Sequence, residues 1–165
     1  MSFFAVSNDL FESRGPNDVR LGQLTSSTTL EDLCAQTSGV VVAGYPDDEG
    51  IQLNKGRVGA SKAPNEIRRF FYRMTPDGRQ SHFTPIYDLG NLEPRTPLGE
   101  RHEAARLAAF RALQCGHVWA GLGGGHDYGF PDMSALVQFA RSKNRPAWIL
   151  NFDAHLDVRD TKNGF

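Results

Sequence analysis

Gly39-Val40-Val41-Val42-Ala43-Gly44-Tyr45 is the stretch that decides the fold class of this 165-residue chain. It is a short, continuous apolar run rich in β-branched residues, which is typical of a strand buried on both faces. Three later runs also have strand character, at residues 83–89, 117–122 and 147–152. Helices are predicted over residues 64–71, 98–114 and 132–143. Because strands and helices alternate, the sequence predicts an α/β fold in three layers, with a parallel sheet flanked by helices.

The length of the chain predicts one domain, and its charge balance favours a small molecule as the partner. Residues 1–165 are expected to form a single domain, in which residues 1–38 are a poorly defined leader region with little periodicity. The chain has 18 Lys and Arg against 19 Asp and Glu, a formal net charge of −1. No basic run rises above this balance, which argues against nucleic acid or a membrane surface as a partner. A small molecule is the expected partner.

The termini and cysteines favour the cytoplasm. The segment 1–6 has no basic residue before its short apolar patch, so it does not resemble a secretory signal. No segment approaches the length of a membrane span. Cys34 and Cys115 are far apart in sequence and have neither metal nor redox spacing, so we expect a reducing compartment and no disulfide.

Asn151-Phe152-Asp153-Ala154-His155-Leu156-Asp157 predicts a metal site. Asp153, His155 and Asp157 stand at every second residue, so in a strand their side chains project from one face. Carboxylate and imidazole suit manganese, iron or zinc, and one carboxylate has two oxygens with which to bridge two ions. Singly, such residues at a strand end often only bind water or cap a turn, but their alternation favours metal binding.

A second motif, Gly121-Leu122-Gly123-Gly124-Gly125-His126-Asp127, precedes it. Consecutive glycines allow a close backbone approach and positive φ, which would aim His126 into a shared site. A phosphate-binding loop is the alternative, but the spacing fits neither of the usual glycine patterns and no Lys-Ser/Thr follows. Asp127 could orient His126 or bind a metal-bound water. The alternative is that it only marks the start of the following helix. The other histidines, at positions 82, 102 and 117, are expected to have structural or solvent roles.

Together, the motifs at 123–127 and 151–157 resemble the signatures of the ureohydrolases, the family of arginase, agmatinase and formimidoylglutamase. The resemblance covers most of the chain from Gly39 onward and implies an arginase-like fold. It also implies two Mn²⁺ ions, with His126 and Asp157 on one ion, His155 on the other, and Asp153 bridging both. A metal-bridging hydroxide would then attack a carbon that carries an amidine or guanidine nitrogen. Family members commonly oligomerise, so a homo-oligomer is an expectation of the resemblance.

Residues 48–68 and the sequence Leu156-Asp157-Val158-Arg159 look more like formimidoylglutamases than arginases. This implies hydrolysis of N-formimidoyl-L-glutamate to L-glutamate and formamide in histidine degradation. Arg159 stands where arginases have a substrate-contacting Asn, and a guanidinium binds a carboxylate at two points. We therefore expect Arg159, with Arg57 or Asn54, to bind the glutamate part. Alternatively, Arg159, Arg57 and Asn54 are solvated or paired with other neighbours. The chain could also be an agmatinase or arginase type of guanidine hydrolase.

One signature of the family has no counterpart here. Ureohydrolases carry a further strand end with two more aspartates that complete the metal shell, and no residue after Phe165 supplies it. Two octahedral ions need about a dozen coordination positions, more than two His and two Asp provide. We therefore expect the chain to be the amino-terminal portion of a truncated domain. A catalytically incomplete, non-enzymatic fragment is the alternative to an enzyme.

Overall fold

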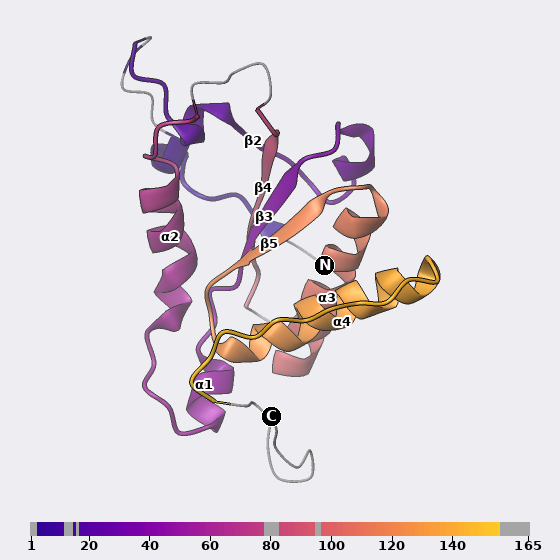
Figure 1. Ribbon diagram of the computed structural model, residues 1–165. Helices are drawn as coiled ribbons and strands as arrows, with labels where there is room; N and C mark the ends of the chain where they lie inside the picture. Colours follow the sequence, from indigo (N-terminus) through magenta and orange to yellow (C-terminus); the bar gives the residue numbers. More distant parts are fainter. Residues whose placement is uncertain (1–2, 12–14, 16, 78–82, 95–96, 156–165) are drawn as a thin grey trace.

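The computed structural model describes residues 3–11, 15, 17–77, 83–94 and 97–155. Five strands and four α-helices form the described part (Figure 1). The strands are β1 (Phe3–Phe4), β2 (Thr25–Ser27), β3 (Val40–Gly44), β4 (Ile86–Leu92) and β5 (Val118–Leu122). The helices are α1 (Glu49–Leu53), α2 (Ala63–Phe71), α3 (Leu98–Gln114) and α4 (Gly129–Ser142).

The sheet has the order β1-β4-β3-β5, and β2 pairs with β4 beside β1. β3 pairs in parallel with β4 and with β5, and Val40 lies opposite both Ile86 and Val118. β1 alone runs antiparallel, against the end of β4. The predicted parallel sheet is therefore confirmed, with β3 between two neighbours.

Alternate residues of β3 face opposite layers of helices. Val41 and Ala43 pack in one buried cluster with Ala112 of α3. Val42 faces the other way and packs with Ile86, against which Phe71 of α2 lies. Because successive side chains of a strand point to opposite faces, β3 must be apolar throughout. Figure 1 shows α2 on one side of the sheet and α3 with α4 on the other, so the predicted three-layer arrangement is confirmed.

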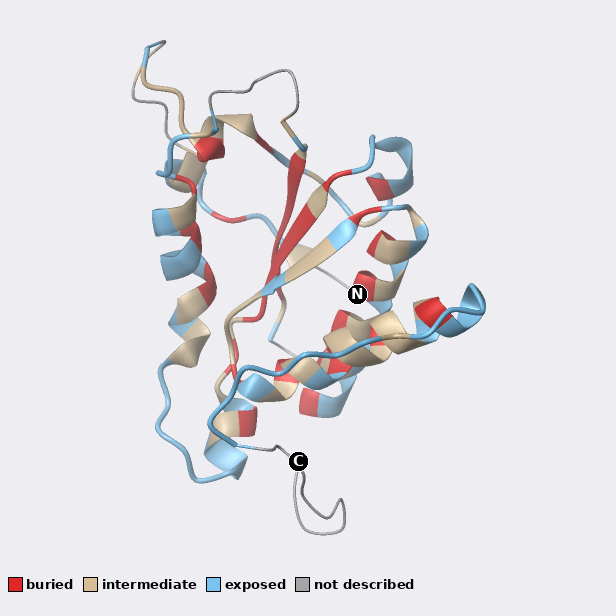
Figure 2. Cartoon of the chain, in the orientation of Figure 1, coloured by how far each residue is buried: buried red, intermediate tan, exposed pale blue. Residues whose placement is uncertain are grey.

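The prediction of a strand over 147–152 is wrong, because these residues form no regular secondary structure. Trp148, Leu150 and Phe152 are 84%, 81% and 95% exposed. Figure 2 shows most of the described segment that follows α4 in pale blue, that is, as exposed. A strand needs a neighbour for its backbone hydrogen bonds, and within the described part of the chain β5 pairs only with β3. Apolar composition predicts strand character but does not supply that neighbour.

Smaller differences concern element boundaries. β4 begins at Ile86 rather than at residue 83, directly after Pro85, whose carbonyl accepts a hydrogen bond from Val40 N–H at 2.8 Å. Proline has no N–H to donate and therefore suits the start of a strand. α4 begins at Gly129 rather than at residue 132, with Pro131 in its first turn, where the missing N–H does no harm. The segment between β3 and α2, for which no helix was predicted, contains α1.

The expectation of no disulfide is also wrong. Cys34, in a 3-10 turn at Leu33–Ala35, is joined to Cys115 at the end of α3, with their Cα atoms 4.7 Å apart. Sequence separation concealed this proximity, because the fold brings the segment before β3 next to the segment before β5. No helix in the described ranges is long and apolar enough to cross a membrane.

Candidate metal centre

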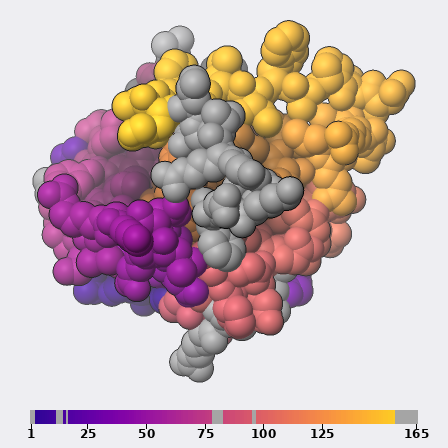
Figure 3. Space-filling view, turned by 90° about the horizontal axis from the view of Figure 1, so that it is seen from below, coloured from indigo at the N-terminus to yellow at the C-terminus, as the bar shows by residue number. Residues whose placement is uncertain are grey.

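Two loops meet beyond the carboxyl ends of the parallel strands β3 and β5. The N–H of Gly125, after β5, donates to the Asp47 carbonyl at 3.1 Å, and the N–H of Gly124 donates to Ala60 at 3.3 Å. In open α/β sheets this edge is where ligands bind. Seen from below, the purple segment that follows β3 and the salmon start of α3 lie on one face of the molecule (Figure 3).

The glycine turn adopts the predicted conformation. Gly123 and Gly124 have φ values of 60° and 81°. A Cβ atom on Gly124 would lie 2.2 Å from the carbonyl oxygen of Tyr45, so both the positive φ and the close approach require glycine. The turn leads directly into the 3-10 turn His126–Tyr128, and thus places His126 at the carboxyl end of β5.

Asp153 lies between the two candidate histidine ligands. Its Oδ2 is 3.8 Å from Nδ1 of His126, and its Oδ1 is 3.0 Å from Nδ1 of His155. The backbone N–H of His155 donates to the same Oδ1 at 2.8 Å and, with the His155 ring, lowers the pKa of Asp153. The structure thus brings three of the four candidate ligands together. Asp157 lies outside the described residues.

The donors present fit a transition metal in chemical type. Imidazole nitrogen and carboxylate oxygen suit Mn²⁺, Fe²⁺ and Zn²⁺, and each imidazole faces a different oxygen of Asp153. No three such side chains enclose an ion in the part of the chain that the structure describes. The arrangement is therefore a set of compatible donors at one sheet edge and not a closed metal cage.

A buried ionic network behind this site was missed by the sequence analysis. Arg101 of α3 donates to Asp47 at 2.7 Å and to Glu49 at 2.6 Å, and the Tyr128 hydroxyl donates to Asp47 at 2.6 Å. Burial raises the pKa of Asp47, but the hydrogen bonds from Tyr128, the Glu49 amide and Arg101 outweigh it and lower the pKa below its ordinary value. The network ties α3 to the loops that follow β3 and β5.

His102, the next residue of α3, bonds to Asp127. The His102 Nε2–H donates to Asp127 Oδ2 at 2.6 Å. Asp127 is therefore held by a histidine to which the sequence analysis gave only a structural or solvent role. Residues 102 and 127 belong to different elements, and no spacing rule connects them. The position of Asp127 directly after His126 was the only sequence signal that this aspartate could belong to the site.

The candidate substrate residues are only partly placed. Asn54 follows α1, is exposed, and donates from Nδ2 to the Gly50 carbonyl at 3.0 Å. Arg57 is exposed further along the same loop. This loop meets the glycine turn through the hydrogen bond from Gly124 N–H to Ala60. Arg159 lies outside the described residues.

Comparison with known proteins identifies the family. The model of the arginase family matches residues 38–165. A formimidoylglutamase of Hahella chejuensis is 36% identical over 129 residues, which are 77% of this chain and 39% of that protein. One from Aeromonas hydrophila is 37% identical, over 73% of this chain and 37% of that protein. The chain thus spans about two fifths of the length of these curated relatives.

Solved structures agree on the fold. Trypanosoma cruzi formiminoglutamase with Mn²⁺ superposes with a TM-score of 0.73 at 30% identity, over 89% of this chain and 49% of that one. Bacillus subtilis formimidoylglutamase has a TM-score of 0.74 at 21% identity, over 93% of this chain and 47% of that one, which supports the fold alone. The predicted arginase-like fold is confirmed. Since the family model matches more than half of the residues of this chain, the chain belongs to the arginase family.

Proposed function

We propose that this chain carries the ligands His126, Asp153, His155 and Asp157 of a manganese-dependent hydrolase of N-formimidoyl-L-glutamate. The observation that carries the proposal is the placement of Asp153 between the imidazoles of His126 and His155. The relatives named formimidoylglutamase and the related structure with Mn²⁺ support the same reaction and ion. We propose a small-molecule substrate and a cytoplasmic site of action. A homo-oligomer stays a prediction.

The reaction transfers the formimidoyl carbon from the glutamate nitrogen to water. The products are L-glutamate, which keeps its own nitrogen, and formamide. Bound divalent cations would lower the pKa of a coordinated water and would stabilise the negative charge that develops on the substrate in the transition state. The part of Asp153 is to present two carboxylate oxygens toward two imidazoles, and its lowered pKa keeps it ionised at neutral pH. The part of the glycine turn is to place His126 at the same edge.

The glutamate end of the substrate needs cationic partners, because it carries two carboxylates. We propose Arg159 as the main partner, with Arg57 or Asn54 assisting from the loop that meets the glycine turn. Arg57→Ala should then raise KM for formimidoylglutamate and leave kcat nearly unchanged. Arg69→Ala, on α2 and paired with Glu66 at 3.1 Å, is the control for loss of a surface charge. Equal KM values for Arg57→Ala and the wild type would remove Arg57 from the proposal.

The first test is a side-by-side assay of the manganese-loaded chain with formimidoylglutamate, arginine and agmatine. Turnover of formimidoylglutamate alone would support the proposed reaction and substrate. Turnover of arginine or agmatine would instead favour a guanidine hydrolase. Inactivity toward all three would contradict catalysis by this chain and favour the non-enzymatic alternative.

Metal binding is tested separately by calorimetric titration of the metal-free chain with Mn²⁺. Asp153→Asn keeps the size of the side chain but removes its charge, so it should lose most of the affinity. Asp32→Asn, at an exposed carboxylate bonded to Thr29, should bind like the wild type. Equal affinity in wild type and Asp153→Asn, or no binding by the wild type, would contradict the proposed ligand set.

A further inference from the structure

His102 and Asp127 form a largely enclosed pair directly behind the candidate ligand His126. Their side chains are only 14% and 12% exposed. His102 comes from the first half of α3, and Asp127 from the turn between β5 and α4. A hydrogen bond to a charged carboxylate is stronger than one between neutral groups. The pair therefore links the turn that carries His126 to α3, which packs on one face of the sheet.

The carboxylate of Asp127 has little room to move. A Cβ atom on Gly50 would lie 2.4 Å from its Cγ, and one on Gly125 would lie 2.0 Å from its Oδ1. Glycine backbone thus lies against Asp127 from two segments, and His102 reaches its other oxygen, Oδ2. The close fit defines one position for the carboxylate.

The His102 ring is itself held in orientation. Tyr128 packs edge-on against it, with ring centroids 4.9 Å apart and an interplanar angle of 86°. The Tyr128 hydroxyl in turn donates to Asp47, which Arg101 also binds. His102 and Arg101 are consecutive residues of α3, so one turn of this helix bonds to both the loop after β3 and the turn after β5.

His117 shows how a purely structural histidine differs. It is buried, its Nδ1 accepts from Gly39 N–H at 3.2 Å, and its Nε2–H donates to the Leu33 carbonyl at 2.8 Å. Both of these hydrogen bonds are to backbone atoms of the segment that precedes β3. His102 instead binds a side chain adjacent to His126, at the carboxyl ends of β3 and β5.

We propose that His102 is a positioning residue, which holds Asp127 and thereby fixes the turn that presents His126 to the metal centre. The inference rests on the proposed role of His126 as a ligand. Residues that orient metal ligands typically change metal affinity about 10- to 100-fold when removed. His102 does not touch the reacting atoms and acts only through Asp127 and the turn.

Amide hydrogen exchange of the metal-free chain tests the positioning step without any metal. The reporters are Gly125 N–H, bonded to the Asp47 carbonyl, and Tyr128 N–H, bonded to the Gly125 carbonyl. His102→Ala should speed exchange of both amides about tenfold, because an unpaired, enclosed carboxylate destabilises the turn. His102→Gln, whose amide nitrogen can donate in place of Nε2, should restore most of the protection. His117→Ala is the matched control, and should leave these two amides protected.

Gly50→Ala is a second variant that keeps His102 intact. Alanine is favoured over glycine inside a helix such as α1 by about 1 kcal/mol, so the substitution is not expected to harm α1 by itself. Its Cβ would nevertheless displace the Asp127 carboxylate, and should speed exchange at Gly125 and Tyr128 as His102→Ala does. Unchanged exchange in both variants, or equal acceleration in His117→Ala, would overturn the positioning role.

The link to the metal is tested by Mn²⁺ titration of the same variants. His102→Ala should bind Mn²⁺ about 10- to 100-fold more weakly than the wild type, and His102→Gln within about threefold of it. If His102→Ala speeds amide exchange in the turn but leaves the Mn²⁺ affinity unchanged, the link between His102 and the metal site is overturned. If the wild type binds no Mn²⁺, the proposed ligand set fails, while the exchange data still decide whether His102 positions the turn.

Discussion

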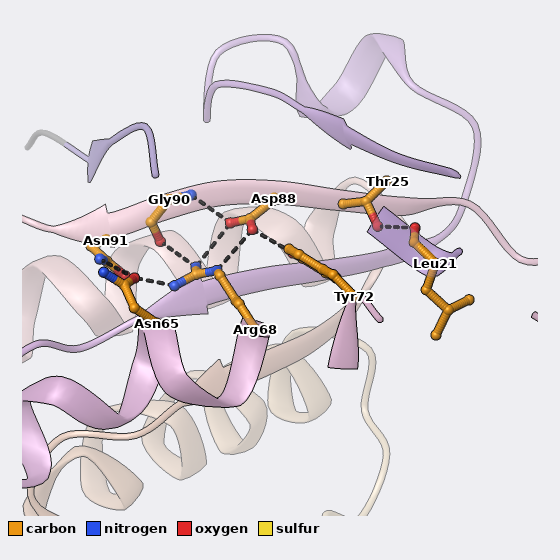
Figure 4. Close-up of polar contacts among 8 residues, drawn as sticks. All are labelled: Leu21, Thr25, Asn65, Arg68, Tyr72, Asp88, Gly90 and Asn91. Carbon is orange, nitrogen blue, oxygen red and sulfur yellow. Dashed lines mark hydrogen bonds and ion pairs between the residues drawn. The ribbon is translucent and has the colours of Figure 1, made fainter. Parts of the chain in front are cut away.

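Arg68 of α2 binds Asp88 of β4 at two points, with Nε 2.8 Å from Oδ2 and Nη2 2.9 Å from Oδ1 (Figure 4). Both side chains are completely buried. The Tyr72 hydroxyl donates to Asp88, and Nη1 of Arg68 donates to Asn91 at 2.7 Å. A buried carboxylate is tolerated in a strand only when such partners replace its water. The network explains how β4 remains in the core although its sequence is partly polar.

Loss of Arg68 should therefore strongly destabilise the fold. Arg68→Ala leaves the Asp88 carboxylate buried without its main partner, and is expected to lower the free energy of unfolding by about 3–5 kcal/mol. The next residue gives the control: Arg69 pairs with Glu66 at 3.1 Å, and the two side chains are 53% and 48% exposed. Arg69→Ala should cost less than about 1 kcal/mol. Urea unfolding measures both, and similar values for the two variants would contradict the account.

A second prediction concerns Asp132 at the start of α4. Burial raises its pKa to about 6, although the Tyr45 hydroxyl and the Trp119 indole N–H, at 2.6 and 2.9 Å from Oδ1, act in the opposite direction. In an unfolded chain this carboxyl titrates near 4. Between about pH 4 and pH 6 the folded chain keeps a proton that the unfolded chain has lost. The free energy of unfolding should therefore fall as pH rises through this window.

Asp132→Asn isolates this effect, since asparagine keeps an oxygen acceptor but does not ionise. The stability of the variant relative to the wild type should increase by on the order of 2 kcal/mol between pH 4 and pH 7. Asp48 is the contrast, because the Ser61 hydroxyl at 2.6 Å lowers its pKa. The stability that Asp48 contributes is present above pH 4 and is lost as pH falls, so Asp48→Asn should show the opposite trend. A stability difference between Asp132→Asn and the wild type that does not change with pH would contradict the raised pKa of Asp132.

The Cys34–Cys115 disulfide should make stability depend on redox conditions. It closes a loop with a sequence separation of 81 residues, for which the chain-entropy model gives roughly 4.5 kcal/mol. The oxidised chain should therefore unfold at a higher urea concentration than the chain reduced with dithiothreitol. Cys34→Ser, which cannot form the bond, should behave like the reduced chain under both conditions. Detection of two free thiols after equilibration with oxidised glutathione would contradict this prediction.

Sequence predicted best those elements whose signals are local. β3 and β5 agree with their apolar runs to within one residue at each end, and α3 has its predicted bounds, Leu98–Gln114. Gly116, with φ 85°, follows the end of α3 as a helix-stopping glycine should. These features depend on hydrophobic pattern and backbone chemistry within a few residues, which a single sequence contains.

Sequence failed where a distant partner decides the outcome. No sequence signal indicated the buried partner of Asp88 and Asn91, because Arg68 precedes them by 20 and 23 residues. Residues 147–152 have strand composition but lack a pairing strand in the described part of the chain. In the candidate site, motifs singled out His126 and Asp153, whereas no motif pointed to His102. Its contact with Asp127 spans 25 residues and two elements.

The glycine turn gives a last prediction. Gly124 has φ 81°, where a side chain is strained, and a Cβ would lie 2.2 Å from the Tyr45 carbonyl oxygen and 3.1 Å from the Tyr45 Cβ. Gly124→Ala must therefore move the turn away from β3, which should lower the free energy of unfolding by about 1–3 kcal/mol or more and weaken Mn²⁺ binding through His126. Gly99→Ala is the matched control, since nothing lies within 4 Å of its added Cβ in the first turn of α3. Alanine there should stabilise the chain by up to about 1 kcal/mol and leave Mn²⁺ affinity unchanged. Urea unfolding and Mn²⁺ titration of both variants decide the matter, and equal behaviour of the two would show that the turn tolerates a side chain at Gly124.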